Sequence, residues 1–235
     1  MGQIVSLSFF RFAGWRARAW ALWMMGAARG PLARTQDIGF WKLCGSGVGH
    51  GFSPTANPSV FAILATWPDE DTARARIAES PLWSRYRDRA SEHWSVFLSP
   101  QTARGNWSGK EPFSPLTEPF SGPLAALTRA TIRPSILFRF WGRVPRISDL
   151  IGANDDVAFK IGIGEVPLLQ QVTFSIWPSK AAMDAFARTG PHAEAIRAVR
   201  SEGWFSEELY ARFAVRSDIG TWGGVSPLAA LKEAA

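Results

Sequence analysis

Ala62-Ile-Leu-Ala-Thr-Trp-Pro68 is an apolar run that ends in Trp-Pro, and it returns as Val172-Thr-Phe-Ser-Ile-Trp-Pro178. Each run reads as a buried strand, and the Trp-Pro pair marks the point where a helix follows. Asp69 and Asp71 stand early in the first of these helices, where negative charge complements the helix dipole, and Ser179 takes the capping position of the second. The same strand-to-helix junction therefore occurs twice, 110 positions apart.

Other short motifs also occur in two copies. The aligned pairs are Arg11 and Arg129, Trp23 and Trp141, and Lys42 and Lys160 at a shift of 118; Gly45-x-Gly47 and Gly162-x-Gly164 at 117; Pro81 and Pro191 at 110; and Gly105-x-Trp107-x-Gly109 and Gly220-x-Trp222-x-Gly224 at 115. The shift changes because one half has a longer loop after Gly47 and the other has an insertion near Gly203. These pairs predict an internal duplication.

Each half reads strand, helix, strand, strand, helix, strand, with first-half strands expected at 5–12, 39–44, 60–67 and 94–98. One such unit is a ferredoxin-like sandwich, whose sheet has helices on one face and needs cover on the other. The second copy supplies that cover. We therefore predict an α+β fold in which tandem ferredoxin-like repeats form, within one chain, a barrel of the kind usually made by a dimer. The expected divisions are a first half 1–111, a Pro/Ser-rich linker 112–123, a second half 124–224 and a C-terminal tail 225–235.

Composition favours a folded cytoplasmic protein. A chain of 235 residues with 46% hydrophobic residues can bury a sizeable core, and its single cysteine, Cys44, cannot form an internal disulfide. The apolar run at 19–28 follows a predicted strand, and the same pattern returns in the second half, which argues against a secretory signal. The sequence has no run of the roughly 20 apolar residues that span a bilayer.

The net charge of +6 and the pI near 10.1 suit nucleic acid, an anionic membrane surface or an acidic protein. The basic residues are scattered and carry no nucleic-acid-binding motif, so we expect no nucleic-acid partner. Twelve tryptophans favour an apolar ligand pocket or a membrane interface. Arg16 and Arg18 stand among the aromatics of 15–23 with no acid nearby, which predicts peripheral membrane contact, although an ordinary core helix is the alternative.

His192 is the most informative difference between the halves, because its counterpart 110 positions earlier is Leu82. A Gly-Pro pair opens a helix just before it, so His192 lies in the first turn on the apolar stripe with Ala195, Ile196 and Val199. Burial and the positive end of the helix dipole both disfavour imidazolium and leave a neutral ring that can ligate a metal. The alternative is a buried histidine bonded to a backbone carbonyl.

The remaining candidates are weaker. His50 lies in a Gly-rich loop and His93 precedes a strand, and since no two histidines are close in sequence, an iron site of two histidines and a carboxylate needs long-range assembly. Cys44 fits a small buried hydrophobe. Glu165 has no visible catalytic partner, and Gly45-x-Gly47 is too short for a dinucleotide fingerprint.

Long motifs across nearly the whole chain resemble the spheroidene monooxygenase family, the acyclic carotenoid 2-ketolases of purple photosynthetic bacteria. The segments that carry the resemblance are Leu7-Ser-Phe-Phe-Arg-Phe12, Gly39-Phe-Trp-Lys-Leu-Cys-Gly-Ser-Gly47, Ala62 to Pro68, Gly164-Glu-Val-Pro167, Val172 to Pro178, Pro191-His192, Gly203-Trp-Phe205 and Glu208-Leu-Tyr-Ala-Arg-Phe213. The resemblance implies a haem b monooxygenase that places a keto group at C2 of spheroidene and related carotenoids, using O2 and reduced ferredoxin. A polyene substrate of this kind resides in lipid, so the resemblance also implies contact with the inner membrane.

By the same resemblance, His192 is the expected iron ligand. Arg129 and Lys160 are candidate contacts to the haem propionates, although their recurrence as Arg11 and Lys42 favours a repeated structural role. Trp204 and Phe205 occur in the insertion that follows the histidine helix and are expected to line the pocket.

Three other functions stay open at this point. One is a different haem enzyme of the same architecture, similar to an aldoxime dehydratase or a peroxidase, with His192 still the ligand. Another is a haem-binding or carotenoid-binding protein without catalysis. The third is a cofactorless monooxygenase of the related small barrels. The sequence does not specify the oligomeric state.

Overall fold

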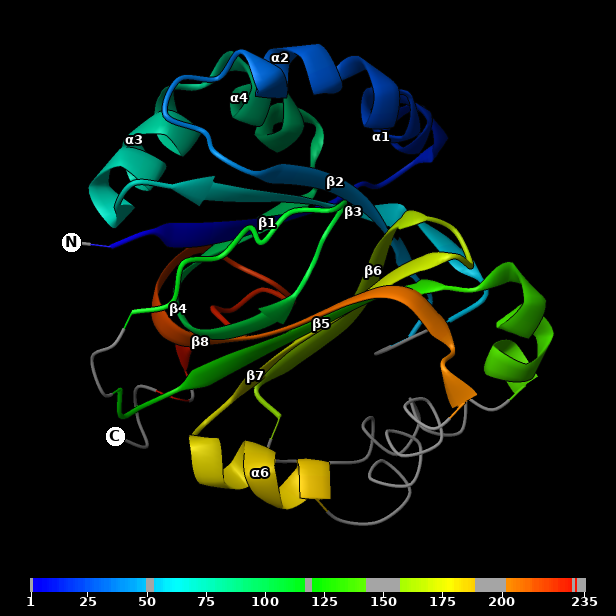
Figure 1. The fold of residues 1–235 in the computed structure, drawn as a ribbon. Helices are drawn as coiled ribbons and strands as arrows, with labels where there is room; N and C mark the ends of the chain where they lie inside the picture. Colours follow the sequence, from blue (N-terminus) through cyan, green and yellow to red (C-terminus); the bar gives the residue numbers. More distant parts are fainter. Residues whose placement is uncertain are drawn as a thin grey trace.

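Eight antiparallel strands close into one barrel in a computed structural model of the chain (Figure 1). The structure describes residues 2–49, 53–116, 120–142, 157–188, 202–229 and 231. Around the barrel the strands follow the order β1-β3-β2-β6-β7-β5-β8-β4. Within the described parts of the chain, no helix combines the length and the hydropathy that crossing a bilayer requires.

The elements follow the predicted order in both halves. In the first half they are β1 (Ile4–Arg11), α1 (Trp15–Ala27), α2 (Arg29–Ala33), β2 (Trp41–Gly47), β3 (Ala56–Trp67), α3 (Glu70–Glu79), α4 (Pro81–Arg89) and β4 (Glu92–Gly105). In the second half they are β5 (Leu124–Ile132), η1 (Pro134–Ile136), a helix over 137–142, β6 (Phe159–Val166), β7 (Gln170–Trp177), α6 (Lys180–Arg188) and β8 (Phe205–Gly220). Both β3 and β4 are longer than predicted, because polar residues continue these strands beyond the apolar runs.

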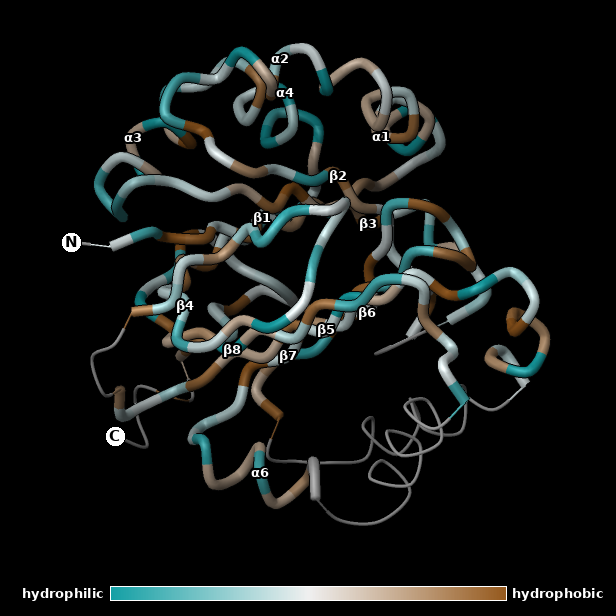
Figure 2. Tube along the Cα trace, in the orientation of Figure 1, coloured by the Kyte–Doolittle hydropathy of each residue, from teal (hydrophilic) through white to brown (hydrophobic). Residues whose placement is uncertain are grey.

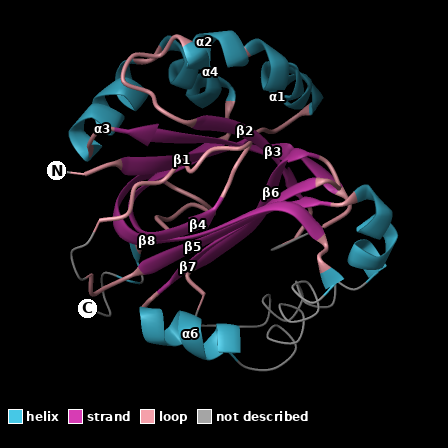
Figure 3. Cartoon of the chain, in the orientation of Figure 1, coloured by secondary structure: helices cyan, strands magenta, loops and turns pink. Residues whose placement is uncertain are grey.

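The barrel consists of two ferredoxin-like sheets joined along two seams. In each half the strands lie in the order fourth, first, third, second, which is β4-β1-β3-β2 and β8-β5-β7-β6. The seams are the β2–β6 and β4–β8 pairs, on opposite sides of the barrel. Helices cover the outer faces: α1 to α4 lie over the first sheet, and α6 lies against the second (Figure 3). The predicted tandem α+β barrel is confirmed.

The capping residues near both Trp-Pro junctions behave as the sequence indicates. The carboxylate of Asp69 is the N-cap of α3 and accepts the N–H of Thr72 at 2.7 Å. The hydroxyl of Ser179 accepts the N–H of Ala182 at 3.2 Å at the start of α6. Both bonds satisfy helix-end N–H groups that lack partners within the helix.

Aromatic rings fill the barrel interior. Phe9 stacks on Trp94 with ring centroids 5.6 Å apart, and Phe159, Phe174 and Trp222 all lie within 6.2 Å of one or both of these rings. Figure 2 shows hydrophobic residues along the strands that surround this centre. The interior is therefore a packed core.

The linker and the tail also contribute to this core. Phe113 of the linker is buried and meets Phe213 edge to face at 5.1 Å, and the side chain of Gln3 bonds the backbone of Pro112 and Ser114. Leu228 of the tail is buried in the same cluster. Both segments therefore help to close the barrel.

The strand registers correct the predicted alignment of the halves. Arg11 of β1 lies opposite Glu92, and the residue opposite the corresponding Glu207 of β8 is Thr131. The shift between β1 and β5 is therefore 120, from 11 to 131, instead of 118. Arg129 consequently lies two residues further into the barrel than Arg11, and its side chain is 1% exposed against 40%.

The predicted equivalence of Lys42 and Lys160 is also wrong. Lys42 pairs with Leu64, a residue of the barrel core, so its side chain points into the barrel. Lys160 stands between Phe159 and Ile161, which both belong to that core, so its side chain points outward. Side chains alternate along a strand, and an alignment error of one residue exchanges the two faces.

A network at the rim of the first half joins it to the last loop of the barrel. Glu92 pairs with Arg11 at 3.0 Å and accepts the N–H of Gly224 at 2.7 Å. The guanidinium of Arg11 lies over the ring of Trp222, 4.3 Å from its centroid. The second Gly-x-Trp-x-Gly loop is thereby held against the first half.

The matching network in the second half lies deeper. Glu207 pairs with Arg129 and accepts the N–H of Gly109 at 2.7 Å, and Arg129 lies 5.9 Å from the ring centroid of Trp107. Burial alone would raise the pKa of Glu207, but the N–H donors of the 108–109 backbone and the charge of Arg129 outweigh it, so the pKa lies below its ordinary value of 4.5.

Acid should weaken the barrel through these two carboxylates. Because the folded pKa values of Glu92 and Glu207 are lowered, their stabilisation is present above about pH 4.5 and is lost as pH falls through the folded values. Glu207→Gln should cost about 3 kcal/mol at pH 7, since it leaves Arg129 buried and unpaired, and Glu92→Gln about 1 kcal/mol. Urea unfolding from pH 7 to pH 3 measures both. The exposed Glu111→Gln is the control, and equal losses in all three variants would contradict the account.

Candidate functional site on the outer face of the second sheet

The outer face of the first sheet is filled by large apolar side chains. Phe10, Leu43, Phe61 and Ile63 are each at most 5% exposed there, and Trp41 packs beside them. They belong to one continuous cluster with buried residues of the four covering helices. Large apolar side chains therefore fill the space between this sheet and its helices.

The second sheet carries small or polar side chains at the same five positions. The register pairs are Phe10 and Ala130, Trp41 and Lys160, Leu43 and Gly162, Phe61 and Gln171, and Ile63 and Thr173. At each position the second-half residue has less apolar volume than its first-half counterpart. The five second-half residues lie on the three neighbouring strands β5, β6 and β7. A set of large side chains that fills one half has therefore been lost from the other half.

Apolar clusters border this small-residue face at two ends. At one end Trp177 and Met183 pack with Leu124 beneath α6. At the other end Phe140 and Trp204 pack against Ile132. In Figure 3, α6 and the helix over 137–142 lie at separate ends of the second sheet. Apolar clusters thus lie at two ends of the small-residue face.

The structure brings three of the predicted site residues to this face. Lys160 points outward from β6, and burial lowers its pKa. Trp204 is 3% exposed in the cluster with Phe140, and Phe205 packs against that cluster. The polar edge of Trp204 donates to Glu202 at 2.9 Å, so its ring is held in place.

Arg129 lies on the barrel side of the same sheet, so it and Lys160 point to opposite faces. The Nε of Arg129 and the hydroxyl of Thr131 have no hydrogen-bond partner among the described residues. The predicted iron ligand, His192, lies outside the described residues, and so does His50.

The structure places the weaker candidates, Cys44, Glu165 and His93, away from the small-residue face. Cys44 is fully buried in the barrel, where burial, followed by the charge of Glu165, raises the pKa of its thiol, and it packs there as a small apolar side chain. Glu165 does have partners: it pairs with Lys42 at 2.7 Å and accepts the N–H of Trp107. His93 is half-buried, and burial lowers its pKa. In the described residues no group of His, Cys, Asp or Glu could hold a metal ion.

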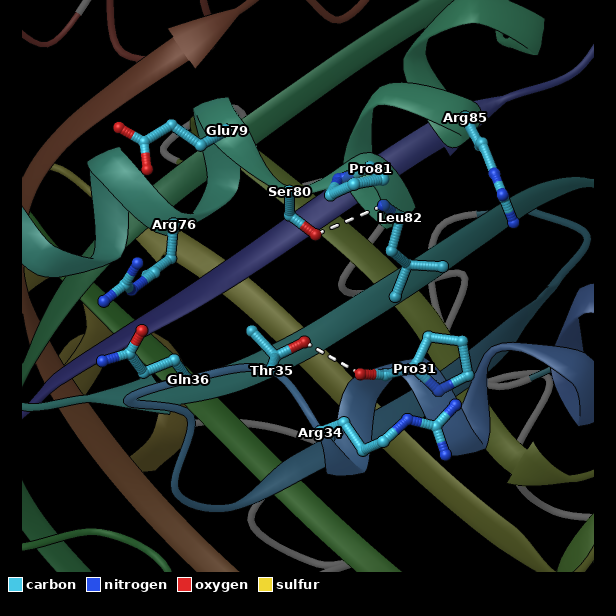
Figure 4. A pocket seen from close by; sticks show the side chains of 10 residues that line it. All are labelled: Pro31, Arg34, Thr35, Gln36, Arg76, Glu79, Ser80, Pro81, Leu82 and Arg85. Atoms are coloured by element: carbon cyan, nitrogen blue, oxygen red, sulfur yellow. Dashed lines mark hydrogen bonds between the residues drawn. The ribbon is translucent and has the colours of Figure 1, made fainter.

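A pocket of about 520 Å³ opens elsewhere, between α2 and the junction of α3 and α4 (Figure 4). Its lining residues are Pro31, Arg34, Thr35, Gln36, Arg76, Glu79, Ser80, Pro81, Leu82 and Arg85. The lining holds the carboxylate of Glu79 and three guanidinium groups, one of which pairs with Asp37, and it holds no aromatic ring. This polar pocket is poorly matched to an apolar ligand.

Three curated relatives share most of the chain. A spheroidene monooxygenase of Cereibacter sphaeroides is 52% identical over 96% of this chain and 71% of its own length, and one of Rhodobacter capsulatus is 49% identical over 96% and 95%. One of Rubrivivax gelatinosus is 38% identical over 88% and 80%. The chain belongs to the spheroidene monooxygenase family. It is therefore an oxidoreductase, as the sequence resemblance predicts.

A solved structure supports the fold independently. An aldoxime dehydratase in complex with butyraldoxime superposes with a TM-score of 0.65 over 96% of this chain and 85% of its own, at 11% sequence identity. This likeness concerns the fold alone. A search of protein-family models gives no match.

The small residues of the face are the part of the site that sequence reasoning missed. Ala130, Gly162 and Thr173 carry no chemical signal by themselves, and the predicted alignment placed Gly162 opposite Gly45. The strand register shows that Gly45 corresponds to Gly164 and that Gly162 replaces a leucine. Only a comparison of the two halves strand by strand shows that each of these residues stands where the first half has a large apolar side chain.

The two outer faces should respond oppositely to matched substitutions. Ile63→Thr in this spheroidene monooxygenase family member should lower the unfolding free energy by about 2 to 3 kcal/mol, because it leaves a buried hydroxyl in a packed cluster. Thr173→Ile at the corresponding position should change it by less than about 1 kcal/mol. Urea midpoints measure both. Equal destabilisation would show that the second face is as tightly filled as the first.

Proposed function

We propose that this chain is a haem-dependent monooxygenase that introduces a keto group at C2 of spheroidene and related acyclic carotenoids. The observation that carries the proposal is the loss of five large side chains from the outer face of the second sheet, in a chain whose relatives are named for spheroidene. The electrons would come from reduced ferredoxin, as the sequence resemblance implies.

The described residues fit a haem b on this face. Gly162, Ala130 and Thr173 leave the surface of the sheet low enough for a flat macrocycle, and the aromatic clusters at its ends offer apolar edges. The chain that carries His192 leaves the described structure after α6 and resumes at Glu202, and Met183 of α6 and Trp204 both pack in the clusters that border this face. We assign His192 as the iron ligand and Lys160 as a propionate contact, since the cationic side chain of Lys160 extends from β6 on this outer face of the sheet.

The haem would supply activation of O2, and the protein would supply ligation, orientation and exclusion of water. Two successive hydroxylations at C2 give a geminal diol, which loses water to form the ketone. Each hydroxylation places one oxygen atom of O2 in the substrate and releases the other as water, with two electrons and two protons taken up. Reduced ferredoxin therefore has to deliver electrons in two separate rounds.

The aromatic cluster beside the face suits a polyene. Phe140 meets Trp204 and Phe205 edge to face with centroids 6.1 Å apart, and Trp141 lies 5.1 Å from Phe140. Rings in this arrangement give a rigid apolar wall along which a conjugated chain can lie. We propose that this cluster orients the carotenoid end and that the enzyme takes its substrate from the inner membrane by peripheral contact.

Replacing His192 with Leu tests the proposal. The residue at the corresponding position of the first half is Leu82, which is buried at 5% exposure in the first turn of α4, so leucine is compatible with such a turn. We expect the variant to fold, to lose its Soret absorbance and to form no ketone from spheroidene with O2 and reduced ferredoxin.

His93→Leu is the matched control, because it removes a histidine from the rim of β4, away from the small-residue face. It should retain haem and activity. A His192→Leu protein with full haem content and an unshifted spectrum would reject the ligand assignment. A wild-type protein that purifies without haem and stays active would reject the haem dependence itself.

A further inference from the structure

Eight large apolar side chains are exposed in the described chain, and six of them lie on segments on one side of the barrel, near the β2–β6 seam. These six are Trp15, Leu22 and Trp23 of α1, Val48 after β2, Phe138 in the helix over 137–142 and Val166 at the end of β6. We call these six residues the apolar rim. In Figure 1, α1, the β6–β7 turn and the helix over 137–142 all lie toward the right-hand side.

Hydrogen bonds and strand pairing connect these segments across both halves. The chain just before α1 bonds to the start of β3 through the N–H of Phe12, which donates to Ser59, and Val48 donates to Thr55 just before β3. β2 then pairs with β6 at the seam. The helix over 137–142 is fixed to the β6–β7 turn by Trp141, whose ring N–H donates to Leu168 at 3.2 Å. The rim is therefore one surface that follows the β2–β6 seam.

The outward side of α1 is unusual for a helix that covers a sheet. Ala21 and Met24 are buried against the sheet, as expected, yet Trp15, Leu22 and Trp23 on the opposite side are 74%, 67% and 65% exposed. Figure 2 shows hydrophobic residues at several points along α1. A surface helix normally turns polar residues outward, so this apolar side indicates an apolar partner.

The positive charge around the apolar rim favours an anionic bilayer over an acidic protein as the partner. The first 36 residues contain five arginines and no acidic residue or lysine. Arg16 and Arg18 of α1 are exposed, and Arg133 is exposed beside the helix that carries Phe138. Tryptophan and leucine surrounded by arginine match the boundary between acyl chains and anionic headgroups. An acidic protein would satisfy the arginines but would leave the exposed rings without apolar contacts.

We propose that the apolar rim docks this protein on an anionic phospholipid bilayer, with the α1 rings inserted at headgroup depth and Phe138 at the same surface. The inference rests on the proposed function in one respect: Phe138 neighbours the aromatic cluster of Phe140 and Trp204, so docking would open a path from lipid to the small-residue face. The binding itself requires neither haem nor carotenoid.

Vesicle flotation with the purified full chain tests the surface. The protein should bind phosphatidylglycerol vesicles at low salt and phosphatidylcholine vesicles much more weakly, and added salt should weaken the binding. Trp15→Ser with Trp23→Ser should lower the partition coefficient by about tenfold or more, with circular dichroism and haem content unchanged. The matched control is Ile219→Ser with Val225→Ser, which removes the other two exposed apolar residues near the opposite seam and should bind as the wild type does.

Failure of this inference is distinguishable from failure of the proposed function. A wild-type protein that ignores both kinds of vesicle, or a tryptophan variant that binds as tightly as the control, overturns the docking surface and leaves the haem assignment standing. Salt-sensitive binding of an acidic protein without vesicle binding would also overturn it. Vesicle binding that survives in a haem-free His192→Leu protein supports the docking surface, whatever the catalytic assay gives.

Discussion

The closure of two open sheets through the β4–β8 ladder is the constraint on which the rest of the structure depends. Each ferredoxin-like half has two edge strands whose N–H and C=O groups need partners. The long pairing from Trp94 with Gly220 to Gly105 with Leu209 joins one pair of edges, and the shorter β2–β6 pairing joins the other. Because both sheets then share one interior, their inner faces must fill it together, and the outer faces are free to diverge.

Because the outer faces of the two sheets can diverge, the two halves have different roles. The first sheet keeps a continuous apolar cluster beneath its helices, so it stabilises the barrel. The second sheet has two separated clusters on its outer face with small residues between them. Burial of apolar side chains is the main stabilising contribution in folding. A half that gives up this burial can keep its fold because the other half and the common interior hold it in place.

The sequence predicts the duplication, the order of elements and the barrel, because Trp-Pro junctions and the Gly-x-Trp-x-Gly loops recur at fixed shifts. It does not predict the register: Arg129 lies two residues deeper than its apparent partner Arg11, and Lys160 faces away from the barrel while Lys42 faces into it. The first-half counterpart of a residue such as Gly162 can be identified only from the strand register, which depends on pairing between residues that are distant in the sequence. The assignment of His192 rests on the difference between the halves and on the family resemblance, since that residue lies outside the described structure.

The most direct measurement of the central claim is a haem titration, followed by Soret absorbance, of Gly162→Leu beside its mirror variant Leu43→Gly. Each variant gives one half the residue that the other half has at the same register position. The account predicts that Gly162→Leu folds but binds no haem, since leucine fills the face, and that Leu43→Gly binds haem as the wild type does while losing stability. Normal haem binding by Gly162→Leu would contradict the account and place the cofactor elsewhere.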